Sequence, residues 1–215
     1  MRAMFYDETA RIVNASKGLL KEWKIVEGGV LLIPQNANFD AFVVAKRPLG
    51  FSSDFKWVFT APVTFSYSKG DPTLMHMKMK SLECSMEIRG LIRREYKFVE
   101  NPLRKALFPF IPFDGGLAET LNADSRVREL LKKASPEELQ VTCYYELLPG
   151  RSQVESMIEY SRRPEKLGWL ITASKASYVE PVLPLVFRNM FYLFDAIGQL
   201  LKTFTSELFR SVETK

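Results

Sequence analysis

The C-terminal residues 184–210 limit the fold more than any other part of this sequence, because their apolar residues recur at helical spacing. At about 100° per residue, one side of a helix that contains Phe187 collects the following apolar residues: Leu183, Met190, Phe191, Phe194, Ile197, Leu201, Phe204 and Leu208. With Leu193 and Leu200 included, the apolar arc is about 180° wide, broader than the stripe of about 100° on a surface helix. We therefore expect this helix to be covered on two sides.

A transmembrane role is not expected for this helix. Asp195 and Lys202 interrupt every window of about 18 residues, and a spanning helix needs an uninterrupted apolar run of that length. One flank of the helix can pack on a sheet, whereas the flank with Leu193, Leu200 and Phe204 needs another cover. Three covers are open: a second helix of the same chain, a second copy of the protein in a homodimer, or a bound apolar ligand.

The preceding segments predict an α+β fold, with a curved, mostly antiparallel sheet of about seven or eight strands packed by the C-terminal helix. A first helix is predicted over 7–23, although Gly18 weakens its middle, and a second over 124–134, capped near Asp124 or Ser125. Pro62 indicates an edge strand or a bulge. The predicted strands lie within 24–34, 39–48, 55–68, 75–88, 91–100, 140–148, 152–161 and 168–175.

The proline- and glycine-rich residues 101–116 form the best candidate boundary between domains. We predict an N-terminal part, 1–100, with a helix and antiparallel strands, and a C-terminal part, 117–210, with a helix, three strands and the long helix. One continuous domain over 1–210 is the alternative. An N-terminal helix, a curved sheet and a closing helix resemble helix-grip folds, a resemblance that implies an apolar ligand held between sheet and helix, but the helix at 124–134 departs from that pattern.

The run LMHMKMK at 74–80 combines soft metal ligands with strand periodicity. Met75, Met77 and Met79 fall on one face of a strand, whereas His76 falls on the other. A copper site needs its ligands to converge, so we expect an ordinary core face and no metal. The apolar alternation slips by one residue near Lys80, which predicts a β-bulge there.

Signatures of catalysis and of cofactor binding are missing from the sequence. It contains one histidine, and it has no nucleotide-binding glycine motif and no nucleophile elbow. We therefore expect no cofactor, and we favour a non-catalytic protein over an enzyme that uses carboxylates without a recognisable motif. Cys84 and Cys143 are expected to be buried free thiols in a reducing compartment, and no secretory signal is recognisable, so the predicted location is cytoplasmic. Glutamate outnumbers glutamine 18 to 4, a compositional bias that is seen in heat-adapted proteins.

The net charge of +5 arises in the N-terminal half, where four cations make a candidate anion contact: Arg89, Arg93, Arg94 and Lys97. Cations beside strand aromatics can hold single-stranded nucleic acid, but the interleaved Glu87 and Glu95 argue against this partner.

The favoured function is binding of an apolar small molecule or a protein partner. The C-terminal helix and a Phe-rich loop would supply the contacts, through Phe108, Phe110, Ile111, Phe113, Leu193, Leu200 and Phe204. The first alternative is the carboxylate-dependent enzyme, and the second is single-stranded nucleic-acid binding through the basic strand.

Overall fold

A computed structural model describes most of the chain. The described residues are 2–26, 29–48, 55–63, 79–82, 86–89, 97–100, 117–146, 168–177 and 184–213, and some side chains within these ranges are outside the description. The Phe-rich loop and the predicted strand at 152–161 lie outside the described residues, as do Met75, His76 and Met77 of the methionine run.

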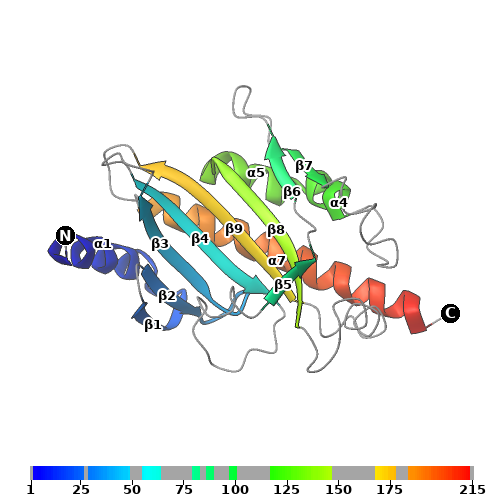
Figure 1. Ribbon diagram of the computed structural model, residues 1–215, viewed down its shortest axis with the longest axis horizontal. Helices are drawn as coiled ribbons and strands as arrows, with labels where there is room; N and C mark the ends of the chain where they lie inside the picture. The colour runs from blue at the N-terminus through cyan, green and yellow to red at the C-terminus, as the bar shows by residue number, and fades with distance from the viewer. Residues whose placement is uncertain are drawn as a thin grey trace.

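A seven-stranded antiparallel sheet forms the centre of the molecule (Figure 1). Its strands, in spatial order, are β1 (Leu20–Val26), β2 (Gly29–Pro34), β3 (Phe42–Pro48), β4 (Phe55–Val63), β9 (Gly168–Ser177), β8 (Glu138–Glu146) and β5 (Met79–Leu82). A separate two-stranded ribbon pairs β6 (Met86–Arg89) with β7 (Lys97–Glu100). The central pair, β4 and β9, runs in register from Phe55 opposite Ser177 to Val63 opposite Trp169.

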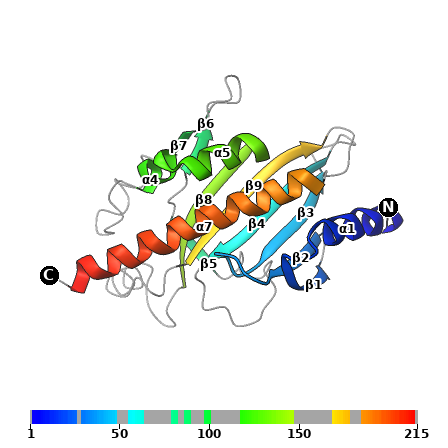
Figure 2. The same cartoon turned by 180° about the vertical axis from the view of Figure 1, so that it is seen from behind.

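The long helix α7 (Pro184–Glu213) crosses one face of this sheet, and its C-terminal part runs past β8 and β5 (Figures 1 and 2). Helix α5 (Ser125–Ala134) lies alongside α7 and follows α4 (Leu117–Ala123). Helix α1 (Arg2–Ala15) approaches the N-terminal part of α7, where Arg188 Nε donates to the Ala15 carbonyl at 2.9 Å.

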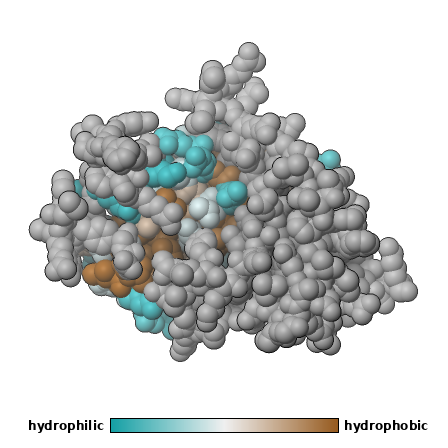
Figure 3. All heavy atoms as spheres, viewed as in Figure 1, coloured by the Kyte–Doolittle hydropathy of each residue, from teal (hydrophilic) through white to brown (hydrophobic). Residues whose placement is uncertain are grey.

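Strand alternation determines which side chains meet α7. In β4, Trp57, Phe59, Ala61 and Val63 are buried in the core shared with α7, because side chains of a strand point alternately to its two faces. The intervening residues of β4 and their neighbours in β9 face the opposite side of the sheet, where both polar and apolar residues are visible (Figure 3).

Three local expectations from the sequence are wrong. The first helix does not reach Trp23, because α1 ends at Ala15 and Gly18 adopts a left-handed conformation with φ of 85°, after which β1 begins. Strand β4 is internal rather than an edge; Pro62 is tolerated because the pairing with β3 ends at Thr60. No bulge occurs at Lys80, because β5 pairs with β8 without a break in register, from Met79 opposite Glu146 to Leu82 opposite Cys143.

Helix α5 has the cap that its sequence predicts. The carboxylate of Asp124 accepts a hydrogen bond from Val127 N at 2.8 Å. At the other end Ser135 adopts a left-handed conformation, and Lys175 Nζ donates to the carbonyls of Ala134 and Ser135 at 3.2 and 3.1 Å. Burial lowers the pKa of the Lys175 ammonium, and the nearby carboxylate of Glu137 opposes that shift.

The α+β class and the antiparallel sheet packed by a C-terminal helix are confirmed. The predicted total of seven or eight strands includes segments outside the described residues, so that total and the curvature of the sheet stay predictions, as does the division of the chain at 101–116. No helix in the described part of the chain is long and apolar enough to cross a membrane.

Close packing between α7 and the loop before β3 generates a stability prediction. A Cβ added at Gly198 would lie inside van der Waals contact with the Asn38 carbonyl oxygen and 3.0 Å from its carbon. Gly198→Ala should therefore destabilise the fold by about 1–3 kcal/mol through overpacking, although alanine is the better helix former by about 1 kcal/mol. Urea unfolding measures the difference. The exposed Ser206→Ala serves as the control within α7 and should change stability by less than about 0.5 kcal/mol; a stabilised Gly198→Ala would contradict the close packing.

Candidate functional site

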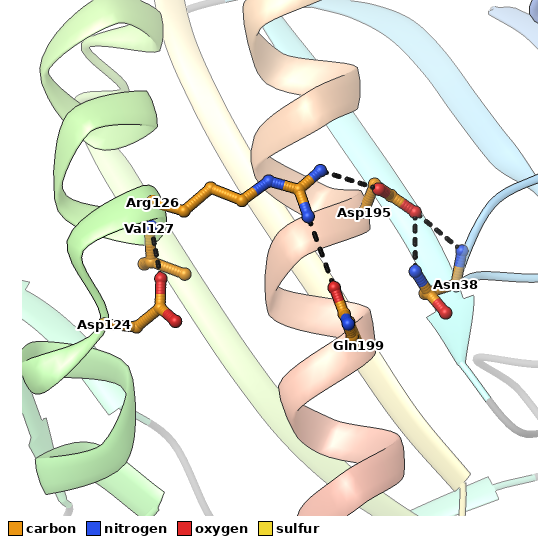
Figure 4. A network of polar contacts seen from close by, with 6 residues as sticks. All are labelled: Asn38, Asp124, Arg126, Val127, Asp195 and Gln199. Atoms are coloured by element: carbon orange, nitrogen blue, oxygen red, sulfur yellow. Dashed lines mark hydrogen bonds and ion pairs between the residues drawn. The ribbon is translucent and has the colours of Figure 1, made fainter.

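A polar junction joins α7, α5 and the loop before β3 (Figure 4). At its centre, Asp195 Oδ1 accepts hydrogen bonds from the backbone N of Asn38 at 2.8 Å and from its Nδ2 at 2.9 Å. The backbone N–H and the side-chain amide of Asn38 thus both donate to this carboxylate, and the two hydrogen bonds hold the loop against the middle of α7. Bonds to a charged acceptor are stronger than those between neutral groups, so Asp195 is a main anchor of this loop.

Arg126 completes the junction from the first turn of α5. Its guanidinium crosses the outer face of α7, donating from Nη2 to Asp195 Oδ2 at 3.1 Å and from Nη1 to Gln199 Oε1 at 3.2 Å (Figure 4). The Asp195 side chain is 18% exposed, whereas that of Arg126 is 51% exposed. Solvent therefore screens the ion pair, and the partly buried hydrogen bonds to Asn38 contribute more to stability than Arg126 does.

An open hollow of about 490 Å³ lies beside this junction. Polar residues supply most of its lining, which consists of Pro34, Gln35, Asn36, Ala37, Asn38, Phe39, Asp40 and Asp195. Amide and carboxylate groups of this kind can hydrogen-bond a small polar group. Within the described ranges, no three histidine, cysteine, aspartate or glutamate residues gather as a metal site would require.

A second polar cluster lies on the opposite face of the sheet. Glu138 Oε2 accepts from Ser174 Oγ at 2.8 Å and from Lys56 Nζ at 3.3 Å. The Ser174 hydroxyl, with a smaller contribution from Lys56, lowers the pKa of the Glu138 carboxyl. Because its pKa is lower in the folded state, this group stabilises the fold above its unfolded pKa and loses that contribution as the pH falls. The side chain of Glu138 is 71% exposed, so the contribution is small.

The three predicted contact residues of α7 differ in exposure. Leu193 is fully buried in the protein's own core, on the flank where α5 lies, whereas Leu200 and Phe204 are only partly buried. The ring of Phe204 meets that of Trp169 edge-on, with 6.4 Å between centroids, and Trp169 Nε1 donates to Thr205 Oγ1 at 2.9 Å. Contact of these residues with a ligand or a partner stays a prediction.

The other predicted contact residues are less fully described. Phe108, Phe110, Ile111 and Phe113 lie outside the described residues, as do Arg93 and Arg94. The antiparallel register of the ribbon places Arg89 opposite Lys97, so these two members of the predicted anion contact lie at one position. Asn122 of α4 holds the ribbon by accepting from Phe98 N at 2.8 Å and donating to its carbonyl at 2.9 Å.

Sequence reasoning missed four exposed apolar side chains. Trp23 and Ile25 of β1 are 47% and 45% exposed, and Leu185 and Tyr192 of α7 are 68% and 40% exposed. Trp23 was assigned to the first helix, although the alternation Glu-Trp-Lys-Ile at 22–25 already has the period of a strand.

The junction predicts unequal effects of its two charged residues. Asp195→Ala should lower the free energy of unfolding by about 1.5–3 kcal/mol, because it leaves the partly buried Asn38 donors without their acceptor. Arg126→Ala should cost less than about 1 kcal/mol, since its ion pair is exposed to solvent. Urea unfolding of both variants measures the two values, and an Arg126→Ala effect as large as that of Asp195→Ala would show that the arginine is the main anchor.

Comparisons of the chain with family models, with curated proteins and with solved structures find no match. Its function is therefore inferred from its own residues and contacts.

Proposed function

We propose that this chain is a non-catalytic binding protein that holds an apolar ligand or a protein partner with α7 and the Phe-rich loop at 108–113. The observation that supports the proposal is the incomplete cover of α7. The contacts of α5 with α7 run from Asn189 to Gln199, while Leu200 and Phe204, which follow, are only partly buried. Apolar side chains left partly in contact with water at one place are suited to an apolar partner.

The proposal includes the predicted curvature of the sheet and the contact role of the Phe-rich loop. A curved sheet would leave room near the C-terminal part of α7, and four large apolar residues in a proline-rich loop would supply a second wall. Leaving those residues in water would cost about 1.5–3 kcal/mol each relative to full burial. Burial against the core or against a partner would remove that cost.

A second candidate function is contact with an anionic partner through the β6–β7 ribbon. The register that places Arg89 opposite Lys97 favours it, because two cations at one position attract phosphate groups. Single-stranded nucleic acid is the partner of this kind that the basic strand suggests. The carboxylate-dependent enzyme would instead need converging buried acids; both oxygens of Asp195 are engaged by Asn38 and Arg126, which gives that acid a structural role.

The binding proposal predicts saturable uptake of a neutral apolar dye, Nile red, by the purified protein. Leu200→Glu should weaken dye binding by about tenfold, because the new charge would have to be desolvated beside the dye. The control, Thr203→Glu, adds the same charge at an exposed position of α7 and should leave the dye affinity unchanged. Fluorescence titration gives the affinities, and circular dichroism verifies that both variants keep their helices.

The Phe-rich loop is tested in the same titration. Phe110→Ser and Phe113→Ser should each weaken dye binding or lower the melting temperature. Dye binding that is absent, or that responds equally to Leu200→Glu and Thr203→Glu, would refute the role of α7. Two loop variants with unchanged dye affinity, melting temperature and oligomeric state would refute the role of the loop.

A further inference from the structure

Strand β1 forms an open edge of the main sheet. It pairs with β2, and the described part of the chain places no strand on its other side (Figures 1 and 2). The five residues from Lys21 to Ile25 are all exposed. An edge strand presents unpaired N–H and C=O groups along its free side, so this edge can accept a further strand.

The two faces of β1 differ in character. The register pairs Trp23 with Leu32 and Ile25 with Val30, so both apolar residues share the face of the sheet that carries α7. Glu22 and Lys24 pair with Ile33 and Leu31 and share the opposite face. Trp23 and Ile25 are nearly half exposed, although they continue the apolar surface of the core. A group that buries Trp23 and Ile25 further has to come from outside the described part of the chain.

The charges of β1 select a second copy of this chain as the partner. In an antiparallel pair of β1 strands centred on Trp23, Glu22 of each copy lies opposite Lys24 of the other, and the two Trp23 residues lie opposite each other. The neighbouring symmetric registers that keep both α7 helices on one side would place Glu22 opposite Glu22, or Lys24 opposite Lys24. Only the register centred on Trp23 pairs opposite charges twice.

We propose that the protein forms a two-fold homodimer in which the two β1 strands pair antiparallel at Trp23 and join two seven-stranded sheets into one. A two-fold axis through Trp23 makes the interface self-complementary, as closed dimers require. Charged residues on an edge strand usually prevent such pairing. In β1 the charges on the two sides of Trp23 have opposite signs, so they repel each other in the two neighbouring symmetric registers and attract each other in this one. This dimer does not depend on the proposed binding of an apolar ligand or a protein partner by α7.

A charge-exchange experiment tests this interface with the full-length chain. Sedimentation equilibrium at low salt should show a dimer. Glu22→Lys and Lys24→Glu should each weaken that dimer by about tenfold, because both cross-strand charge pairs change from attraction to repulsion. A one-to-one mixture of the two variants should restore the dimer, since each cation at one copy's position 22 or 24 then meets an anion of the other copy.

Matched controls separate the interface from general effects of charge. Glu119→Lys in α4 and Lys132→Glu in α5 make the same charge changes at exposed positions away from β1, and both should leave the dimer intact. Leu200→Glu should also leave it intact, which distinguishes this interface from a dimer through α7. A monomeric wild type, a dimer insensitive to Glu22→Lys, or a mixture that stays monomeric would each overturn the proposal.

Discussion

The packing of α7 against the sheet through phenylalanine rings is the contact on which the rest of this structure depends. Phe42 of β3 lies at its centre, with ring centroids of five other phenylalanines 5.2–5.9 Å away: Phe39, Phe59, Phe187, Phe191 and Phe194. Three of the five come from α7, and its rings meet Phe42 edge-on, the arrangement that aromatic quadrupoles favour. The direction in which α7 crosses β3, β4 and β9 is therefore determined by the fit between these rings as well as by the apolar area that the helix buries.

The position of α7 on these rings also determines which hydrogen-bond partners the polar groups around the helix can reach. The loop before β3 passes so close to the helix that only a glycine fits at position 198, and Asp195, one turn earlier, receives the donors of Asn38. Arg126 then ties α5 to the same carboxylate. Close packing and polar satisfaction support each other here, because a shift of α7 that relieved one contact would break the other.

Periodicity predicted the parts of the fold that depend on local pattern. The long helix, the cap at Asp124 and strands such as β4 follow from spacing and residue type within a few neighbours. The junction depends on tertiary neighbours: Asn38 and Asp195 are 157 residues apart, and the sequence shows Asp195 only as a polar residue on a helix. The end of α1 was missed because Ile12, Leu19 and Trp23 fit helical spacing, whereas the left-handed Gly18 breaks the helix between them.

The same misassignment concealed β1 as an edge strand, beside which the described residues place only β2. Helix α7 begins near β3 and runs past β8, so it covers the central strands and leaves β1 beyond its reach (Figure 2). Side chains on the α7-facing side of β1 nevertheless continue the core pattern, with Trp23 beside Leu32 and Ile25 beside Val30. An apolar face that extends one strand past its covering helix has to be covered by a partner or remain in contact with water. The alternating charges on the other face of β1 determine which partner can approach, because an added strand must match both faces in a single register.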